Sequence, residues 1–194
     1  MTALPVIETQ RGNLSAYIPT NLISITDGQI VLDADLFNQD IKPAVDVGLS
    51  VSRVGGEAQT QAMKAVAGEL RLQLSQFEEV ARFARLGTEV DEATRRQIER
   101  GTRLQEVLTQ PPHQPMPLSE QVVLFYAVKQ GMLRDLPVEE VSAFEDSLMD
   151  YFRKEQEEIM EEIELKQDLT GEMQDRLDEV LEEFSRSEEE RSAG

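Results

Sequence analysis

The sequence predicts a mixed fold, in which the end of a larger α/β domain precedes an all-α helical bundle. Before residue 57, short β-prone runs alternate with turn residues, which is typical of strands. After Gly55-Gly56, apolar residues recur every three or four positions up to Phe184, which is typical of amphipathic helices. Residues 185–194 carry charge without apolar anchors. We therefore predict an α/β segment over residues 1–56, a helical domain over 57–184 and a disordered tail over 185–194.

Three short runs in the first segment predict strands: Ala3–Glu8, Gln29–Leu32 and Ile41–Ser52. The first is apolar up to its last residue, a pattern typical of an interior strand of a parallel sheet. Asp27-Gly28 predicts a tight turn before the second run. Helical turns are expected within residues 17–25 and 33–39. Because a parallel sheet needs both faces covered, these strands predict the tail end of a larger domain.

Helical periodicity governs the sequence after Gly56. An amphipathic helix is predicted from Met63 to Ala84. Residues 88–91, Thr-Glu-Val-Asp, predict a capping box before a second helix that reaches about Leu108. The prolines within residues 110–117 predict a stiff linker. Further apolar stripes predict helices over Leu118–Met132, over Val141–Phe152 with a thinner continuation to Ile163, and over Met173–Phe184.

The charge of the chain disfavours some classes of partner. Lys and Arg number 19 against 38 Asp and Glu, so the net charge is −19 at pH 7. Residues 139–191 hold 21 acidic and 6 basic residues, which leaves a local charge of −15. Such a surface repels nucleic acid and anionic membranes, so we expect neither as the main partner. A basic partner protein, or solubility alone, fits this charge better.

Composition also limits the chemistry. The chain has no cysteine, and His113 is its single histidine, so we expect no disulfide and no metal site. No apolar run is long enough to span a bilayer, and Met1–Leu4 lacks the basic start of a secretion signal. The Glu-Glu doublets are typical of solvated helix faces, and no serine has a histidine or lysine at a motif spacing. We expect neither an acid–base pair nor a nucleophilic triad.

The most informative stretch runs from Pro43 to Gly55, with the sequence P-A-V-D-V-G-L-S-V-S-R-V-G. Pro43 fixes one backbone angle, glycines flank a short β-prone run, and Arg53 follows it beside serine hydroxyls. This pattern predicts a chain that leaves a sheet to present one cation. An arginine fork binds phosphate or carboxylate through two parallel hydrogen bonds. The alternative is an arginine in a surface ion pair at a strand edge.

The run P-A-V-D-x-x-x-S-x-S at residues 43–52 closely resembles the signature of the alpha and beta subunits of rotary ATP synthases. Its extension V-G-L-S-V-S-R-V-G is similar to the alpha subunit of the F-type enzyme. Residues 4–10, 16–21 and 23–30 fit the same subunit, and the match weakens only toward the acidic C-terminus. The resemblance implies the C-terminal part of a RecA-like nucleotide-binding domain, followed by the helical domain of that family.

The resemblance implies roles for several residues at a subunit interface. In this family three alpha and three beta subunits alternate in a ring, and the catalytic nucleotide lies on beta at an interface with alpha. Arg53 matches the arginine finger that reaches the terminal phosphate of that nucleotide. Ser50 matches a position needed for activity, where a bulkier residue would displace the loop that carries the arginine. Ser24, Ile25 and Val51 match positions that line the same interface.

A second nucleotide and a rotating stalk complete the implied contacts. Lys42, Pro43 and Gln110 match positions beside the adenine of a nucleotide that is not turned over, although Pro111-Pro112 departs from the commoner glutamine-containing pattern. Gly87, Thr88, Glu89 and Asp91 match a loop that faces the central stalk. The alternatives are ordinary surface polarity for Lys42 and Gln110, and a plain helix–helix turn for the loop.

The chain contains no G-x-x-x-x-G-K-[ST] loop, so by itself we expect it to bind no cofactor and to leave ATP unhydrolysed. In the full complex the resemblance implies ATP or ADP with Mg. It also implies a link to an energy-coupling membrane through partner subunits only, on the cytoplasmic side in bacteria or the matrix or stroma side in organelles. The alternatives are a stand-alone acidic helical module that binds a basic protein, and a related subunit of a vacuolar-type or secretion ATPase.

Overall fold

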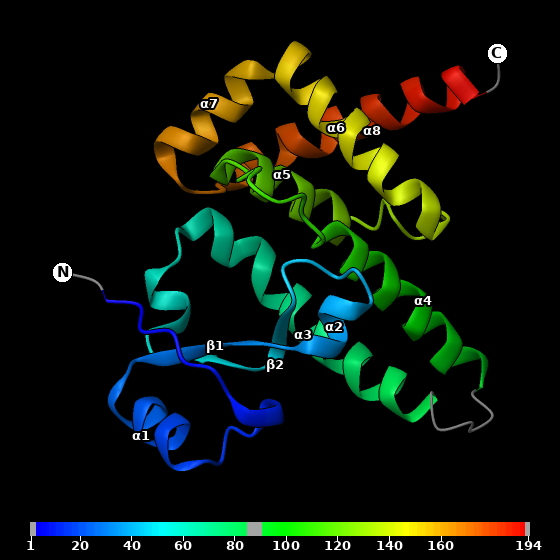
Figure 1. The fold of residues 1–194 in the computed structure, drawn as a ribbon. Helices are drawn as coiled ribbons and strands as arrows, with labels where there is room; N and C mark the ends of the chain where they lie inside the picture. Colours follow the sequence, from blue (N-terminus) through cyan, green and yellow to red (C-terminus); the bar gives the residue numbers. More distant parts are fainter. Residues whose placement is uncertain (1–2, 85–90, 193–194) are drawn as a thin grey trace. The chain divides into compact units, whose positions relative to one another are not determined.

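The computed structural model describes residues 3–84 and 91–192 (Figure 1). The chain divides into two compact units, Met1–Ala58 and Gln59–Gly194, which we call the front unit and the helical unit. This division lies two residues beyond the expected boundary between residues 56 and 57. Each unit is described by itself.

The front unit is built on a two-stranded ribbon with short helices (Figure 1). Its elements are the 3₁₀-helix η1 (Gln10–Gly12), α1 (Tyr17–Ile25), β1 (Gly28–Leu32), α2 (Ala34–Asn38), β2 (Val45–Ser52) and the 3₁₀-helix η2 (Gly55–Ala58). The strands predicted within residues 29–32 and 41–52 are confirmed, as are the helical turns that became α1 and α2. Asp33 caps α2, because its carboxylate accepts hydrogen bonds from the N–H groups of Asp35 (2.7 Å) and Leu36 (3.0 Å).

The prediction of a parallel sheet with an interior strand at Ala3–Glu8 is wrong. β1 and β2 pair antiparallel, and residues 3–8 are exposed and form no regular element. Pro5 explains part of the difference, because it lacks the N–H group that an interior strand would donate. The Asp33 N–H donates to the Ala44 carbonyl at 2.9 Å, which closes the ribbon as a long hairpin around α2. No crossover helix is needed for an antiparallel pair.

The helical unit consists of packed helices (Figure 1). Over its described residues these are α3 (Gln61–Ala84), α4 (Glu92–Val107), α5 (Leu118–Lys129), the 3₁₀-helix η3 (Val138–Glu140), α6 (Val141–Glu155), α7 (Glu157–Lys166) and α8 (Gly171–Ser192). The helices predicted from the apolar stripes are therefore confirmed, and so is the non-helical linker over residues 110–117.

Three boundaries in the helical unit differ from the predictions. Gln156 has φ −129° and ψ 33°, and this break separates α6 from α7 where the sequence suggested one continuous stripe. The predicted disordered tail is wrong for residues 185–192, which continue α8, because no Gly or Pro interrupts the helical hydrogen bonds there. Asp91 itself caps α4, through the Thr94 N–H at 2.7 Å. Thr88, the expected cap, lies outside the described residues.

The core of the helical unit is apolar. Its largest fully buried side chains include Phe152, Phe184, Leu104, Leu124, Leu148, Ile163 and Leu177. Burial of each such side chain contributes roughly 1.5–3 kcal/mol to folding. Phe184 on α8 meets Phe144 on α6 edge-on, with ring centroids 5.8 Å apart, so the two helices are held together by aromatic packing.

Polar groups inside the helical unit are paired. The carboxylate of Glu120, which is 8% exposed, accepts hydrogen bonds from the Arg153 guanidinium at 2.8 and 2.9 Å, and this pairing raises the pKa of Arg153. The Ser119 N–H, at the start of α5, donates to the Glu164 carboxylate of α7 at 3.0 Å. That carboxylate thus lies where the helix dipole favours negative charge. Across the described part of the chain, every buried side-chain nitrogen or oxygen has a hydrogen-bond partner.

Neither a membrane span nor a metal cluster occurs among the described residues. None of the helices in these ranges is both long and apolar enough to cross a lipid bilayer. No three His, Cys, Asp or Glu side chains within residues 3–84 and 91–192 are grouped so that they could hold a metal ion.

We predict that the front unit exchanges its amide hydrogens faster than the helical unit does. Its only buried residues among those described are Pro19 and Ala44, whereas Val6, Ile30 and Leu32 are 94%, 74% and 71% exposed. Few buried contacts imply a low free energy of local opening. Hydrogen exchange followed by mass spectrometry checks this prediction, and protection before Gly55 equal to that of α5 would contradict it.

We also predict that Glu145 on α6 makes the stability of the helical unit depend on pH. Desolvation, followed by the charges of Asp146 and Glu106, raises the pKa of Glu145 from 4.5 to about 7. Because the folded pKa exceeds the unfolded one, the stability that comes from the neutral carboxyl is complete below pH 4.5. It is lost as the pH rises through about 7.

The substitution Glu145→Gln should therefore stabilise the chain at pH 8 and have almost no effect at pH 4. The expected gain is on the order of 1 kcal/mol, since partial exposure to solvent reduces the effect of the pKa shift. Urea unfolding at the two pH values measures it. Glu158→Gln, at an exposed position of α7, is the matched control. An equal gain at both pH values would count against the prediction.

Candidate functional site

Arg53 lies at the end of β2, beside the last turn of α1. Its backbone N–H donates to the Asp27 carbonyl at 2.7 Å, and its guanidinium Nη2 donates to the Ile23 carbonyl at 3.3 Å. The side chain is exposed. Among the described residues no carboxylate forms a salt bridge with Arg53, so the alternative of a surface ion pair finds no support there. The geometry therefore presents a guanidinium to solvent.

The structure brings two of the predicted interface residues close to Arg53. Ser24 and Ile25 follow Ile23, whose carbonyl binds the guanidinium, and both are exposed. The Ser24 hydroxyl donates to the Asn21 carbonyl at 2.7 Å within α1, and Ile25 is 76% exposed. Val51 lies two residues before Arg53 on β2 and is also exposed. Ser24 and Ile25 therefore lie next to the carbonyl that Arg53 contacts, and Val51 lies two residues before Arg53 in the chain.

Ser50 lies in an irregular part of the ribbon and serves its geometry. The pairing of β1 and β2 shifts between Gln29 and Val31, and Ser50 lies on β2 at this shift. Its hydroxyl accepts a hydrogen bond from the Val31 N–H at 3.0 Å and donates to the Asp46 carbonyl at 2.5 Å. The Ser50 side chain thus links Val31 of β1 to Asp46 of β2 at the shift in register, three residues before Arg53.

Gly28 allows the close approach of the two strands at the other side of this shift. It has a backbone φ of +149°, which residues other than glycine rarely adopt, and it pairs with Ser52. A Cβ atom at position 28 would collide with the Val51 carbonyl oxygen and lie 2.9 Å from the Ser52 Cα. The residue that precedes Arg53 is therefore positioned by a contact that only glycine permits.

The predicted adenine contacts are divided between the two units. The Lys42 ammonium forms a salt bridge with Asp40 at 2.7 Å and lies 5.2 Å from the centroid of the Phe37 ring. The hydrogen bond from Lys42 lowers the pKa of Asp40. Pro43 follows Lys42 and is exposed. Gln110 belongs to the helical unit, after α4, and is half-buried.

Asp91 is the only residue of the predicted stalk-facing loop that the structure describes. Its hydrogen bond with the Thr94 backbone lowers its pKa, so the residue carries negative charge at the start of α4. Gly87, Thr88 and Glu89 lie outside the described residues.

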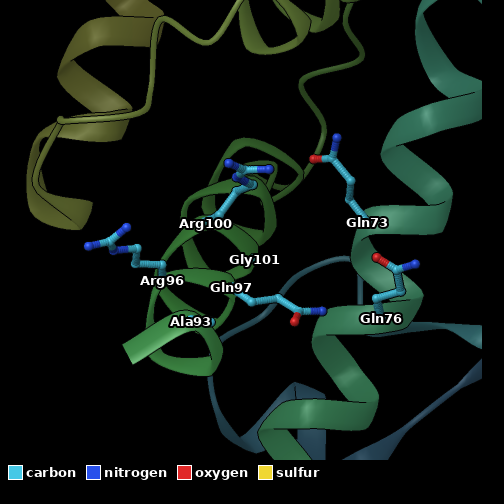
Figure 2. Close-up of a pocket in the computed structure, with 7 residues that line it drawn as sticks. All are labelled: Gln73, Gln76, Ala93, Arg96, Gln97, Arg100 and Gly101. Carbon is cyan, nitrogen blue, oxygen red and sulfur yellow. The ribbon is translucent and has the colours of Figure 1, made fainter. Parts of the chain in front are cut away.

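A polar groove of about 290 Å³ lies between α3 and α4 (Figure 2). Its lining residues are Gln73, Gln76, Ala93, Arg96, Gln97, Arg100 and Gly101. Gln97 reaches from α4 toward α3, whereas Arg96 extends away from α3 and pairs with Glu92 (Figure 2). The groove contains no carboxylate and none of the predicted site residues. Its geometry indicates no acid–base chemistry.

Sequence reasoning missed the polar contacts that organise the ribbon. The Asp46 carboxylate accepts a hydrogen bond from the Leu49 N–H at 2.7 Å, and the Gln29 amide donates to the Leu49 carbonyl at 3.1 Å. Asp46 belongs to the P-A-V-D run, but strand periodicity does not predict a bulge there. The available signal was an Asp at the start of a β-prone run, because an Asp carboxylate readily accepts a hydrogen bond from a backbone N–H a few residues further on.

Comparison with known proteins identifies the family. The model of the ATP synthase alpha/beta chain, C terminal domain, matches residues 59–184. The model of the ATP synthase alpha/beta family, nucleotide-binding domain, matches residues 1–52. The first match covers more than half of the chain, so the chain belongs to the ATP synthase alpha/beta family.

Within this family the chain is similar to alpha subunits, as the sequence resemblance indicated. It is 54% identical over 184 residues to ATP synthase subunit alpha of Aquifex aeolicus, which covers 95% of this chain and 37% of that relative. It is 53% identical over 186 residues to ATP synthase subunit alpha of Mycobacterium bovis, which covers 96% and 34%. The chain thus spans about a third of the length of the curated relatives it matches, in their C-terminal portion.

We predict that Ser50→Ala weakens the ribbon locally. The substitution removes the hydroxyl that accepts a hydrogen bond from the half-buried Val31 N–H, which costs about 1 kcal/mol. Amide exchange at Val31, followed by NMR, should accelerate roughly fivefold. Ser15→Ala, at an exposed position of the same unit, should leave this rate unchanged. Unchanged exchange at Val31 in Ser50→Ala would show that the hydroxyl does not support the bulge.

Proposed function

We propose that this chain is part of the non-catalytic alpha subunit of a rotary ion-translocating ATP synthase, and that Arg53 completes the catalytic site on a neighbouring beta subunit. The exposure of Arg53 supports this most directly. The guanidinium engages one backbone carbonyl and, among the described residues, no carboxylate. Arginine offers five N–H donors in a rigid fork, so donors are left for the phosphate of a nucleotide bound to another chain.

The proposed role of Arg53 is electrostatic. Negative charge is distributed over the oxygens of a phosphoryl group during its transfer, and a nearby guanidinium stabilises that charge. A finger of this kind needs a fixed position, because the guanidinium is permanently charged and its effect depends on where it lies. The carbonyls of Asp27 and Ile23 supply this fixed position in the front unit.

A second proposal concerns a regulatory nucleotide, ATP or ADP with Mg, that is bound and not turned over. Lys42, Pro43 and Gln110 contact its base in this proposal. The side chain of Lys42 is 43% exposed and is held between Asp40 and the Phe37 ring, which supports an ordered polar group at a surface. The nucleotide itself supplies the phosphates and the metal ion, and no residue described here is proposed as a metal ligand.

The proposed partners are the beta subunit, in an alternating ring of three alpha and three beta subunits, and the central stalk. Most of the large apolar side chains that are exposed among the described residues belong to the front unit, and Leu4, Tyr17 and Phe37 are examples. Such a surface is typical of one that other protein covers. In this proposal Gly87, Thr88, Glu89 and Asp91 face the stalk, and the complex lies at the periphery of an energy-coupling membrane.

Arg53→Ala tests the arginine finger in the full-length alpha subunit, assembled with beta and stalk subunits. We expect assembly to persist and the kcat for ATP hydrolysis to fall roughly a thousandfold or more, because transition-state charge loses its partner. Steady-state hydrolysis and size-exclusion chromatography measure the two quantities. Arg53→Lys should rescue little of the rate, because an ammonium lacks the planar fork.

Arg11→Asn is the matched control. Arg11 is an exposed arginine of the same unit with φ +54°, a conformation that asparagine tolerates, so this variant should keep its turnover. Wild-type turnover in Arg53→Ala would overturn the finger role. Tight binding of a basic protein by the 194-residue chain, without assembly into a ring with beta, would favour the acidic helical module instead.

A further inference from the structure

We infer that Asp46 is a positioning residue for Arg53: it holds the bulge in β2 that determines where the arginine emerges from the ribbon. The inference rests on the proposed role of Arg53 and adds to it a residue to which neither the sequence resemblance nor the family comparison gives a role. Asp46 lies seven residues before Arg53 and is half-buried.

The register of the ribbon shows the size of the bulge. At one end Val31 pairs with Asp46 and Leu32 with Val45, while at the other Gly28 pairs with Ser52 and Gln29 with Val51. Two steps along β1, from Gln29 to Val31, correspond to five steps along β2, from Val51 to Asp46. β2 therefore holds three more residues than a regular ladder would need, between its two paired ends.

Asp46 makes two of the contacts that hold these extra residues. Its carboxylate accepts from the Leu49 N–H at 2.7 Å, and its backbone carbonyl accepts from the Ser50 hydroxyl at 2.5 Å. The Gln29 amide adds a contact to the Leu49 carbonyl at 3.1 Å, and the Ser50 hydroxyl accepts from the Val31 N–H at 3.0 Å. The Asp46 side chain thus supplies one of the side-chain contacts that hold the extra residues of the bulge, and it does so within β2 itself.

The consequence for Arg53 follows from strand geometry. If the regular pairing of Val45 and Asp46 continued without a bulge, Gly28 would pair with Leu49 rather than with Ser52. Arg53 would then be displaced by three residues along β1, which is roughly 10 Å at about 3.3 Å per residue. Because three is an odd number, the side chains of β2 would also exchange faces. A guanidinium moved in this way could not keep its bond to the Ile23 carbonyl.

The bulge requires a hydrogen-bond acceptor for the Leu49 N–H at position 46, and it does not require a negative charge there. Asparagine offers the same Oδ1 acceptor and forms the same local turn, whereas alanine offers none. Glutamate keeps the charge but places its oxygens one methylene farther from the Leu49 N–H. The three substitutions therefore separate the geometry of the bulge from the electrostatics of the carboxylate.

The test uses the full-length alpha subunit in the assembled complex with beta and stalk subunits, with MgATP as substrate. We expect Asp46→Ala and Asp46→Glu to lower kcat roughly ten- to a hundredfold with little change in KM, since a small misplacement of a catalytic group has effects of this size. Asp46→Asn should retain most of the turnover. Asp35→Ala, at an exposed acidic position of α2, is the control.

A double-mutant cycle with Arg53→Ala decides whether Asp46 acts through Arg53. In the Arg53→Ala background, Asp46→Ala should cause no further loss of kcat. An equal loss in both backgrounds, or wild-type kcat in Asp46→Ala while Arg53→Ala is slow, overturns this inference and leaves the finger role intact. If Asp46→Ala does not assemble, Asp46→Glu decides in the same cycle. Wild-type kcat in Arg53→Ala would instead overturn the proposed function.

Discussion

The offset in register between β1 and β2 is the constraint on which the front unit depends. A two-stranded ribbon with little buried surface has few ways to fix the position of a side chain at its end. Here the hydrogen bonds that Asp46 and Ser50 accept and that Gln29 donates fix the offset, and Gly28 allows the backbones to meet beyond it. These contacts therefore determine where the guanidinium of Arg53 lies at the end of β2.

The two units hold their structure by different means. In the helical unit, buried side chains such as Phe152 and Leu177 supply the stability, and the Glu120–Arg153 pair satisfies the polar groups that this burial would otherwise isolate. The front unit lacks such a core among its described residues and depends on local hydrogen bonds. In the proposed complex, the surfaces that cover its exposed apolar side chains would also stabilise the ribbon.

The helices could be predicted from the sequence more fully than the sheet could. Apolar spacing from Met63 to Ala84 predicted α3 because a buried helical face imposes its period on the sequence. The strand predicted at Ala3–Glu8 is absent, because a strand needs a neighbouring strand to pair with, and the apolar pattern does not show whether one is present. The motif indicated Arg53 and Ser50, yet the bulge depends on side-chain hydrogen bonds between residues far apart, such as Gln29 and Leu49. Such contacts produce no periodic pattern in the sequence, so they could not be predicted from it.

Gly101 on α4 shows how one missing side chain can set the spacing between two helices. A Cβ atom there would lie 2.1 and 2.2 Å from two ring carbons of Phe77 in α3 and 2.4 Å from its Cβ, so the phenylalanine fills the space that a side chain would occupy. Loss of the ring alone would not make room for an alanine at position 101, because every residue except glycine keeps a Cβ at position 77. The close approach of α3 and α4 at this level is therefore tied to the glycine, and any larger residue there would have to push the two helices apart.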